Sequence, residues 1–172
     1  MQYYVLSFIT DDRPGIVHEL ADAVGSLSGN WLESRMIQLE GKFAGLARIS
    51  VPDDASTSLR QHLEERSGLN LVIEHAPEEQ RNLSAQYTLD IVGNDRPGIV
   101  FETTRVLAEQ GINLIEISSQ VAPAPMSGTP MFNCTATIAT TTQISPQELE
   151  QQLNDATAAL GVDIHVEETS EG

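Results

Sequence analysis

The residues best suited to binding chemistry form a short motif that occurs twice in the chain. Asp12-Arg13-Pro14-Gly15-Ile16-Val17 returns unchanged, at an offset of 83 residues, as Asp95-Arg96-Pro97-Gly98-Ile99-Val100. An asparagine follows eighteen residues after the aspartate in both copies, as Asn30 and as Asn113. The aspartate carboxylate could hold an ammonium group, and the first N–H groups and dipole of a following helix favour a carboxylate by about 0.3–1 kcal/mol. The asparagine amide could bond to either group, so the motif is typical of a receptor for a zwitterion.

A purely structural interpretation of the motif is equally open at this point. Aspartate and asparagine are favoured in turns and caps for local reasons, and both arginines could simply pair with nearby acids. Glycine at the start of a helix permits close approach of backbone or ligand, and Pro14 fits the first helical position, where its missing N–H costs nothing. The copies also differ, because Thr10-Asp11 in the first becomes Gly93-Asn94 in the second. One copy could therefore bind a ligand while the other is degenerate.

The repeat extends well beyond the motif. Tyr4 matches Tyr87 and Glu19 matches Glu102 in the same register, without a gap. An internal repeat is a primary indication of fold, and here it shows that one domain is written twice. We expect a first domain over residues 1–76, a linker over 77–85, a second domain over 86–168 and a tail over 169–172.

Both copies predict the same order of strands and helices from their apolar periodicity. The elements expected in the first copy are a strand over 3–10, a helix beginning at Pro14 and stopping before Gly29, strands over 31–39 and 43–51, a helix ending at Gly68 and a strand over 69–74. Those expected in the second copy are a strand over 87–92, a helix over 97–110, strands over 113–121 and 132–139, a helix that opens with the capping box Ser145-Pro146-Gln147-Glu148 and stops at Gly161, and a strand over 162–166. This βαββαβ order predicts an α+β protein of two ferredoxin-like domains, each a four-stranded antiparallel sheet with two helices on one face.

The second copy contains an insertion over residues 122–130, Ala-Pro-Ala-Pro-Met-Ser-Gly-Thr-Pro, where the first copy has a tight turn at Glu40-Gly41-Lys42. Three prolines and a glycine predict a semi-rigid excursion rather than a strand. The segment could be a tolerated surface insertion, a flap over a ligand or a contact for a partner.

Charge and missing motifs exclude several classes of function. Nine basic residues face twenty-five acidic ones, for a net charge of −16. A surface this acidic repels phosphate, so we expect neither direct nucleic-acid binding nor binding to an anionic membrane. No signal peptide or bilayer-spanning run is recognisable, which predicts a cytoplasmic protein. The chain has no nucleotide-binding glycine-rich loop, no His-Glu-x-x-His, no Cys-x-x-Cys, and only scattered histidines. We therefore expect no catalysis, no metal and no cofactor; an enzyme with an unrecognised site is the alternative of a different class.

The strand, the Asp-x-Pro-Gly-Ile-Val turn, the helix and the following asparagine together resemble the ACT domain, a small-molecule sensing module of amino-acid metabolism. The resemblance covers both copies and so nearly the whole chain. In ACT domains of the serine-sensing dehydrogenase type, the effector sits where two copies meet, held by this turn and this asparagine. The ligand contacts that the resemblance implies are Asp12, Arg13, Pro14, Gly15 and Asn30 in the first copy, and Asp95, Arg96, Pro97, Gly98 and Asn113 in the second.

A freestanding pair of such domains resembles the glycine cleavage system transcriptional repressor family, whose members are two ACT domains and little else. That resemblance implies a non-catalytic regulator that responds to a small amino acid, glycine or serine. It also implies action through a protein partner such as a transcriptional activator, without direct contact with nucleic acid, and we expect a homo-oligomer, namely a dimer. The alternative is a stand-alone ACT regulator of an enzyme in amino-acid or one-carbon metabolism.

Overall fold

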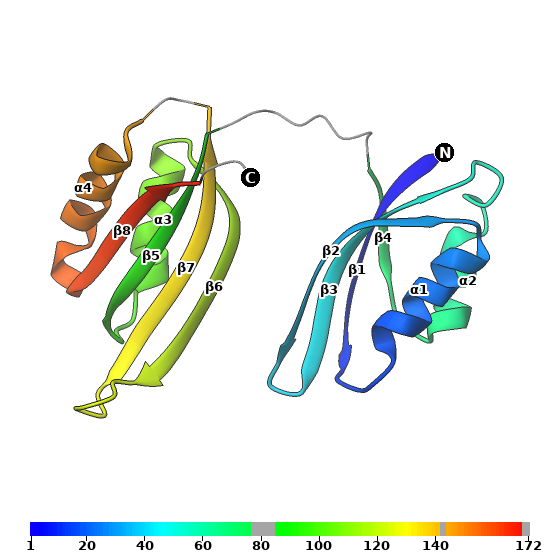
Figure 1. Cartoon of the computed structure of the whole chain (residues 1–172), viewed down its shortest axis with the longest axis horizontal. Helices are drawn as coiled ribbons and strands as arrows, with labels where there is room; N and C mark the ends of the chain where they lie inside the picture. Colours follow the sequence, from blue (N-terminus) through cyan, green and yellow to red (C-terminus); the bar gives the residue numbers. More distant parts are fainter. Residues whose placement is uncertain (77–84, 142–143, 170–172) are drawn as a thin grey trace. The chain divides into compact units, whose positions relative to one another are not determined.

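The computed structural model describes residues 1–76, 85–141 and 144–169. The chain divides into two compact units, Met1–Arg81 and Asn82–Gly172 (Figure 1). The expected linker lies outside the described residues except for Ala85, which begins a strand. Of the expected tail, only Thr169 is described, and its N–H donates to the Gln86 carbonyl at 2.9 Å.

The first unit has the predicted βαββαβ order. Its elements are β1 (Gln2–Asp11), α1 (Ile16–Ser26), β2 (Asn30–Leu39), β3 (Lys42–Val51), α2 (Leu59–Ser67) and β4 (Val72–Ala76). The strands form one antiparallel sheet in the order β2-β3-β1-β4. Both helices cover the same face of this sheet (Figure 1).

The second unit repeats that architecture. Its elements are β5 (Ala85–Asn94), α3 (Ile99–Glu109), β6 (Asn113–Pro123), β7 (Pro130–Thr140), α4 (Pro146–Thr157), a single 3-10 turn (Ala158–Leu160) and β8 (Val162–Glu168). The sheet order β6-β7-β5-β8 corresponds strand by strand to that of the first unit. The prediction of two ferredoxin-like domains is therefore confirmed.

Each unit builds its own core from alternate residues of its strands, because successive side chains of a strand point to opposite faces. In β5, Leu89 is fully buried and Ile91 is 2% exposed, whereas Asp90 between them faces outward. Helix α4 completes this core with Leu149 and Leu153, which are both fully buried. The capping box of α4 is confirmed: the Ser145 hydroxyl accepts the Glu148 N–H at 3.2 Å, and the Glu148 carboxylate accepts the Ser145 N–H at 3.3 Å.

The sheet registers define which residues of the two units are equivalent. Phe8 pairs with Gly45 in the first unit, as Ile91 pairs with Cys134 in the second. The offset is therefore 83 residues between β1 and β5, and also between β2 and β6, but 89 between β3 and β7. Between β4 and β8 it is 93. These equivalences allow the two units to be compared position by position.

Several boundaries differ from the predictions. Helices α1 and α3 begin at Ile16 and Ile99, so the prolines of the motif lie in the preceding turn and not at the first helical position. Strand β4 begins at Val72, three residues later than expected. The insertion is shorter than expected, because Pro123 pairs with Pro130 and only residues 124–129 form the loop. Two backbone hydrogen bonds hold this loop together. The Ala124 N–H donates to the Thr129 carbonyl at 2.8 Å, and the Gly128 N–H donates to the Ala124 carbonyl at 2.9 Å.

Across the described ranges, no helix is long and apolar enough to cross a membrane.

Candidate functional site

The two Asp-Arg-Pro-Gly turns follow the first strand of each unit and lie beside the hairpin between its second and third strands. The Asp12 N–H donates to the Gly41 carbonyl at 2.9 Å, and the Asp95 N–H donates to the Pro130 carbonyl at 3.0 Å. Each turn is thus fixed to its sheet through the backbone, which leaves the aspartate side chain exposed. The loop over residues 124–129 therefore lies next to the turn of the second unit.

The glycine of each motif sets the direction of the helix that follows. Gly15 and Gly98 are the N-cap residues and have φ angles of 95° and 101°, in the left-handed region that side chains with a Cβ rarely adopt. Their carbonyls accept the N–H groups of Glu19 and Glu102 at 2.9 Å, which closes the first helical turn. The motif requires glycine for conformation, and the space around Gly98 is open.

Replacement of Gly98 by alanine is expected to destabilise the second unit by about 1–2 kcal/mol, because alanine is strained at a positive φ. The measurement is thermal unfolding followed by circular dichroism. Gly25 is the control, because it lies in the last turn of α1 with a negative φ and a Cβ added there would meet no atom within 4 Å. Gly25→Ala should stabilise by about 0.5–1 kcal/mol. Equal effects of the two substitutions would contradict a conformational requirement at Gly98.

Neither α1 nor α3 has a side-chain hydrogen bond to cap its N-terminus. The first N–H groups of a helix have no partner within the helix, and together with the helix dipole they favour a bound anion. The start of each helix therefore offers donors to a carboxylate. In the first unit, a surface depression of about 360 Å³ opens here, and it is lined by Asp12, Arg13, Gly15, Ile16, Val17, His18 and Phe43.

The arginine of the first turn is already engaged. Both guanidinium NH groups of Arg13 donate to the Glu19 carboxylate, at 2.7 and 2.5 Å. Hydrogen bonding to Arg13 lowers the pKa of the Glu19 carboxyl, so the pair stays ionised. Lys42 pairs with Asp11 beside the same turn. In this unit the cations next to the helix start are neutralised by acids of the protein itself.

The second turn has the opposite arrangement. Glu102, the equivalent of Glu19, accepts hydrogen bonds from Arg105 at 3.0 and 2.8 Å, and Arg105 also reaches Glu109 at 2.8 Å. Arg96 makes no hydrogen bond or ion pair with another residue that the structure describes. Its guanidinium therefore remains available next to the uncapped start of α3, together with the Asp95 carboxylate. Within the described residues, an identical motif thus presents a paired arginine in one unit and a free one in the other.

One position on the helix accounts for this difference. Where the second unit has Arg105, the first has Asp22, which pairs with Arg66 of α2 instead. Glu19 consequently has no arginine on its own helix to hold it and turns back to Arg13. Two positions, seven and ten residues after the motif aspartate, decide which arginine is free: Glu19 and Asp22 in the first unit, Glu102 and Arg105 in the second. The sequence did not lead us to predict either position as part of the site. Asp22 and Arg105 occupy equivalent positions of the repeat but have opposite charges, and this difference was the signal that could have identified these positions.

The asparagines lie far from the turn of their own unit. Asn30 is opposite Ser50 and hence at the Tyr3 end of β1, whereas the turn follows Asp11 at the other end. Eight residues of strand separate these ends, which corresponds to about 27 Å at 3.3–3.4 Å per residue. Asn113 is placed in the same way in the second unit. The structure therefore brings together the aspartate, arginine and glycine of each motif but not the asparagine. The asparagine could contact a ligand held by such a turn only if that turn did not belong to its own unit.

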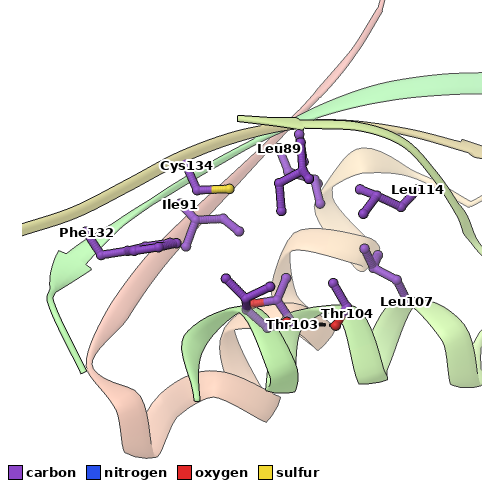
Figure 2. Close-up of a pocket in the computed structure, with 11 residues that line it drawn as sticks. Leu89, Ile91, Thr103, Thr104, Leu107, Leu114, Phe132 and Cys134 are labelled. Atoms are coloured by element: carbon purple, nitrogen blue, oxygen red, sulfur yellow. Dashed lines mark hydrogen bonds between the residues drawn. The ribbon is translucent and has the colours of Figure 1, made fainter. Parts of the chain in front are cut away.

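A second cavity lies in the core of the second unit, between α3 and the sheet (Figure 2). Its lining is apolar, including Leu89, Leu114, Phe132 and Cys134, and the two threonines Thr103 and Thr104 bond to carbonyls of their own helix. Its volume is about 10 Å³, room for one water molecule and too little for an amino acid. Leu114 occupies the position of Trp31, so the smaller side chain contributes to this gap.

Other chemistry is limited in the described part of the chain. Cys134 is 5% exposed, and burial raises the pKa of its thiol, which keeps it protonated and unsuited to act as a nucleophile. Among the described residues, no group of three or more His, Cys, Asp or Glu side chains is placed to hold a metal ion. The turns are therefore the best-supported candidate sites.

Comparisons with known proteins agree with the fold. A solved structure described as an unknown protein from Galdieria sulphuraria is 31% identical, with 98% of this chain and 99% of that chain covered and a TM-score of 0.86. Another, described as a candidate glycine cleavage system transcriptional repressor, is 19% identical, with 99% and 98% covered and a TM-score of 0.70, which is a likeness of fold. No curated protein sequence matches the chain. Family models of the ACT domain match residues 2–73 and residues 87–156. The chain therefore belongs to the ACT-domain family, as a tandem of two ACT domains.

Proposed function

We propose that this tandem ACT protein is a non-catalytic regulator that senses a small amino acid, glycine or serine, at the turn of its second unit. The observation that carries the proposal is the guanidinium of Arg96, which no other described residue engages, beside the uncapped start of α3. Arginine binds carboxylates through two parallel hydrogen bonds, and helix N–H groups add further donors. The Asp95 carboxylate, which also has no partner among the described residues, is the acceptor for the ammonium group.

The expected affinity follows from the size of the ligand. Glycine has five heavy atoms, and a ceiling of about −1.5 kcal/mol per atom limits its binding free energy to about −7.5 kcal/mol, or a few micromolar. An exposed turn should bind well below that ceiling, in the range of about tens of micromolar to millimolar. Such a sensor would respond to a metabolite that is present at high concentration.

The regulator would act through a protein partner rather than through nucleic acid. The second unit contains twelve acidic residues and two arginines, a net charge of −10 with histidine neutral. Such a surface repels phosphate and attracts a basic protein surface. A glycine cleavage system transcriptional repressor that contacts an activator is the specific function that we propose, supported by the tandem architecture. We also propose that the working form is a homodimer.

Isothermal titration calorimetry with glycine and serine tests the proposed site. Wild-type protein should bind one ligand per chain, and Arg96→Ala should weaken binding by about tenfold or more, because it removes a charge-assisted pair. Arg13→Ala is the matched control at the equivalent position, and it should bind as the wild type does. The absence of heat with either amino acid at millimolar concentration would refute amino-acid sensing, and equal losses in both variants would refute the assignment to the second unit.

A further inference from the structure

The sheet of the first unit carries an apolar patch on the face that its helices leave open. Residues paired across strands share a face, so the registers define the patch. Ile37, Ala44 and Ile9 form one row across β2, β3 and β1, and Leu46 and Val72 belong to the next row. Apart from Ala44, these side chains are 52–69% exposed. We call these five residues the apolar patch.

The second unit does not repeat the apolar patch. The equivalent residues, in the same order, are Gln120, Asn133, Val92, Thr135 and His165. The same fold thus accommodates polar side chains at four of the five positions. The fold itself does not require an apolar residue there, and a contiguous exposed apolar surface marks a contact with a partner.

The charged residues on this face are balanced in sign. Glu33 lies opposite Arg48 in the adjacent row, and Glu33 also pairs with Arg35 at 3.1 Å. Glu74 completes that row on β4 through Val5. Asp11 and Lys42, which pair with each other, belong to the row on the other side of the patch. Three acids and three basic residues thus flank the apolar patch in a chain whose net charge is −16. Two copies can meet on this face without the repulsion that their other surfaces would produce.

We propose that the apolar patch is the interface through which two copies of this chain form a homodimer, sheet face against sheet face. Apolar rows of two sheets can interdigitate in this way, as in other sheet-on-sheet contacts. A patch that occurs once per chain closes the contact around a twofold axis and does not propagate into a filament. This inference rests on the homodimer of the proposed function and assigns its surface.

Sedimentation equilibrium of the full chain over about 1–100 µM tests the interface. Wild-type protein should sediment as a dimer. Leu46→Lys places a charge in each half of the patch and should weaken dimerisation by about a hundredfold, since an unpaired charge buried in an interface is strongly unfavourable. Thr135→Lys adds the same charge at the equivalent position of the second unit and should leave the dimer intact. Ile37→Lys with its control Gln120→Lys repeats the test on another strand, should Leu46→Lys fail to fold.

The possible outcomes separate this inference from the proposed effector site. A wild-type protein that is monomeric throughout, or a dimer that both patch variants preserve, overturns the interface. Either result leaves the calorimetric test at Arg96 unaffected. Conversely, a dimer that Leu46→Lys dissociates supports the interface even if no amino acid binds.

Discussion

Truncation of Leu63 to alanine is expected to destabilise the first unit by about 3–4 kcal/mol, a large part of the stability of a domain of this size. Helix α2 has only nine residues, and its sequence is dominated by charged and amide side chains. Leu59 and Leu63, which are 2% and 0% exposed, are the only large apolar residues that attach it to the core. Ser58 at its N-cap makes no side-chain capping bond, and the side-chain bonds that tie the helix to its neighbours, such as Arg66 to Asp22 and His62 to Ser26, are made by surface polar groups.

Trp31 is a specific reporter for this experiment because it is the only tryptophan in the chain and packs against the same core. Denaturant unfolding followed by its fluorescence should show a lower midpoint for Leu63→Ala. Gln61→Ala, on the exposed side of the same helix, is the control and should change stability by less than about 0.5 kcal/mol. A loss below about 1 kcal/mol for Leu63→Ala would mean that α2 contributes little to the core.

The architecture could be predicted from the sequence because several local signals agree within each copy. Helical periodicity predicted α1 and α3, the capping box at Ser145 fixed the start of α4, and the repeat required both copies to fold alike. These signals depend on one residue and its near neighbours, which is why they can be read without a structure. The element boundaries were less accurate, because a proline suits both the first turn of a helix and the turn that precedes it.

The candidate site could be predicted only in part. The motif identified the turn, and glycine is required there, although for its positive φ and not only for close approach. The state of each arginine could not be read from the motif, because it depends on a competition between side chains about ten residues further along the helix. The distance of Asn30 from Asp12 likewise depends on the direction of β2, which a linear motif does not contain.

Substitution of Arg105 by aspartate should close the second site without any change to the motif itself. The variant gives the second unit the residue that the first has at the equivalent position, Asp22. Glu102 then loses its partner on α3 and should pair with Arg96, as Glu19 pairs with Arg13 at 2.5 and 2.7 Å. A ligand carboxylate would have to displace this two-bonded ion pair, so we expect amino-acid binding to weaken by about tenfold or more in calorimetry.

A double variant distinguishes this competition from a general effect of added negative charge. In Arg105→Asp with Glu102→Gln, the neutral amide cannot hold Arg96 as an ion pair, so binding should return to within about threefold of the wild type. The double variant still carries one negative charge more than the wild type. If binding stayed weak, electrostatic repulsion of the ligand carboxylate would explain the loss and the competition for Arg96 would be wrong. If Arg105→Asp alone bound as the wild type does, Glu102 would have no influence on the site. Recovery of binding in the double variant, although one added negative charge remains, is the result expected if the ligand and Glu102 compete for the guanidinium of Arg96.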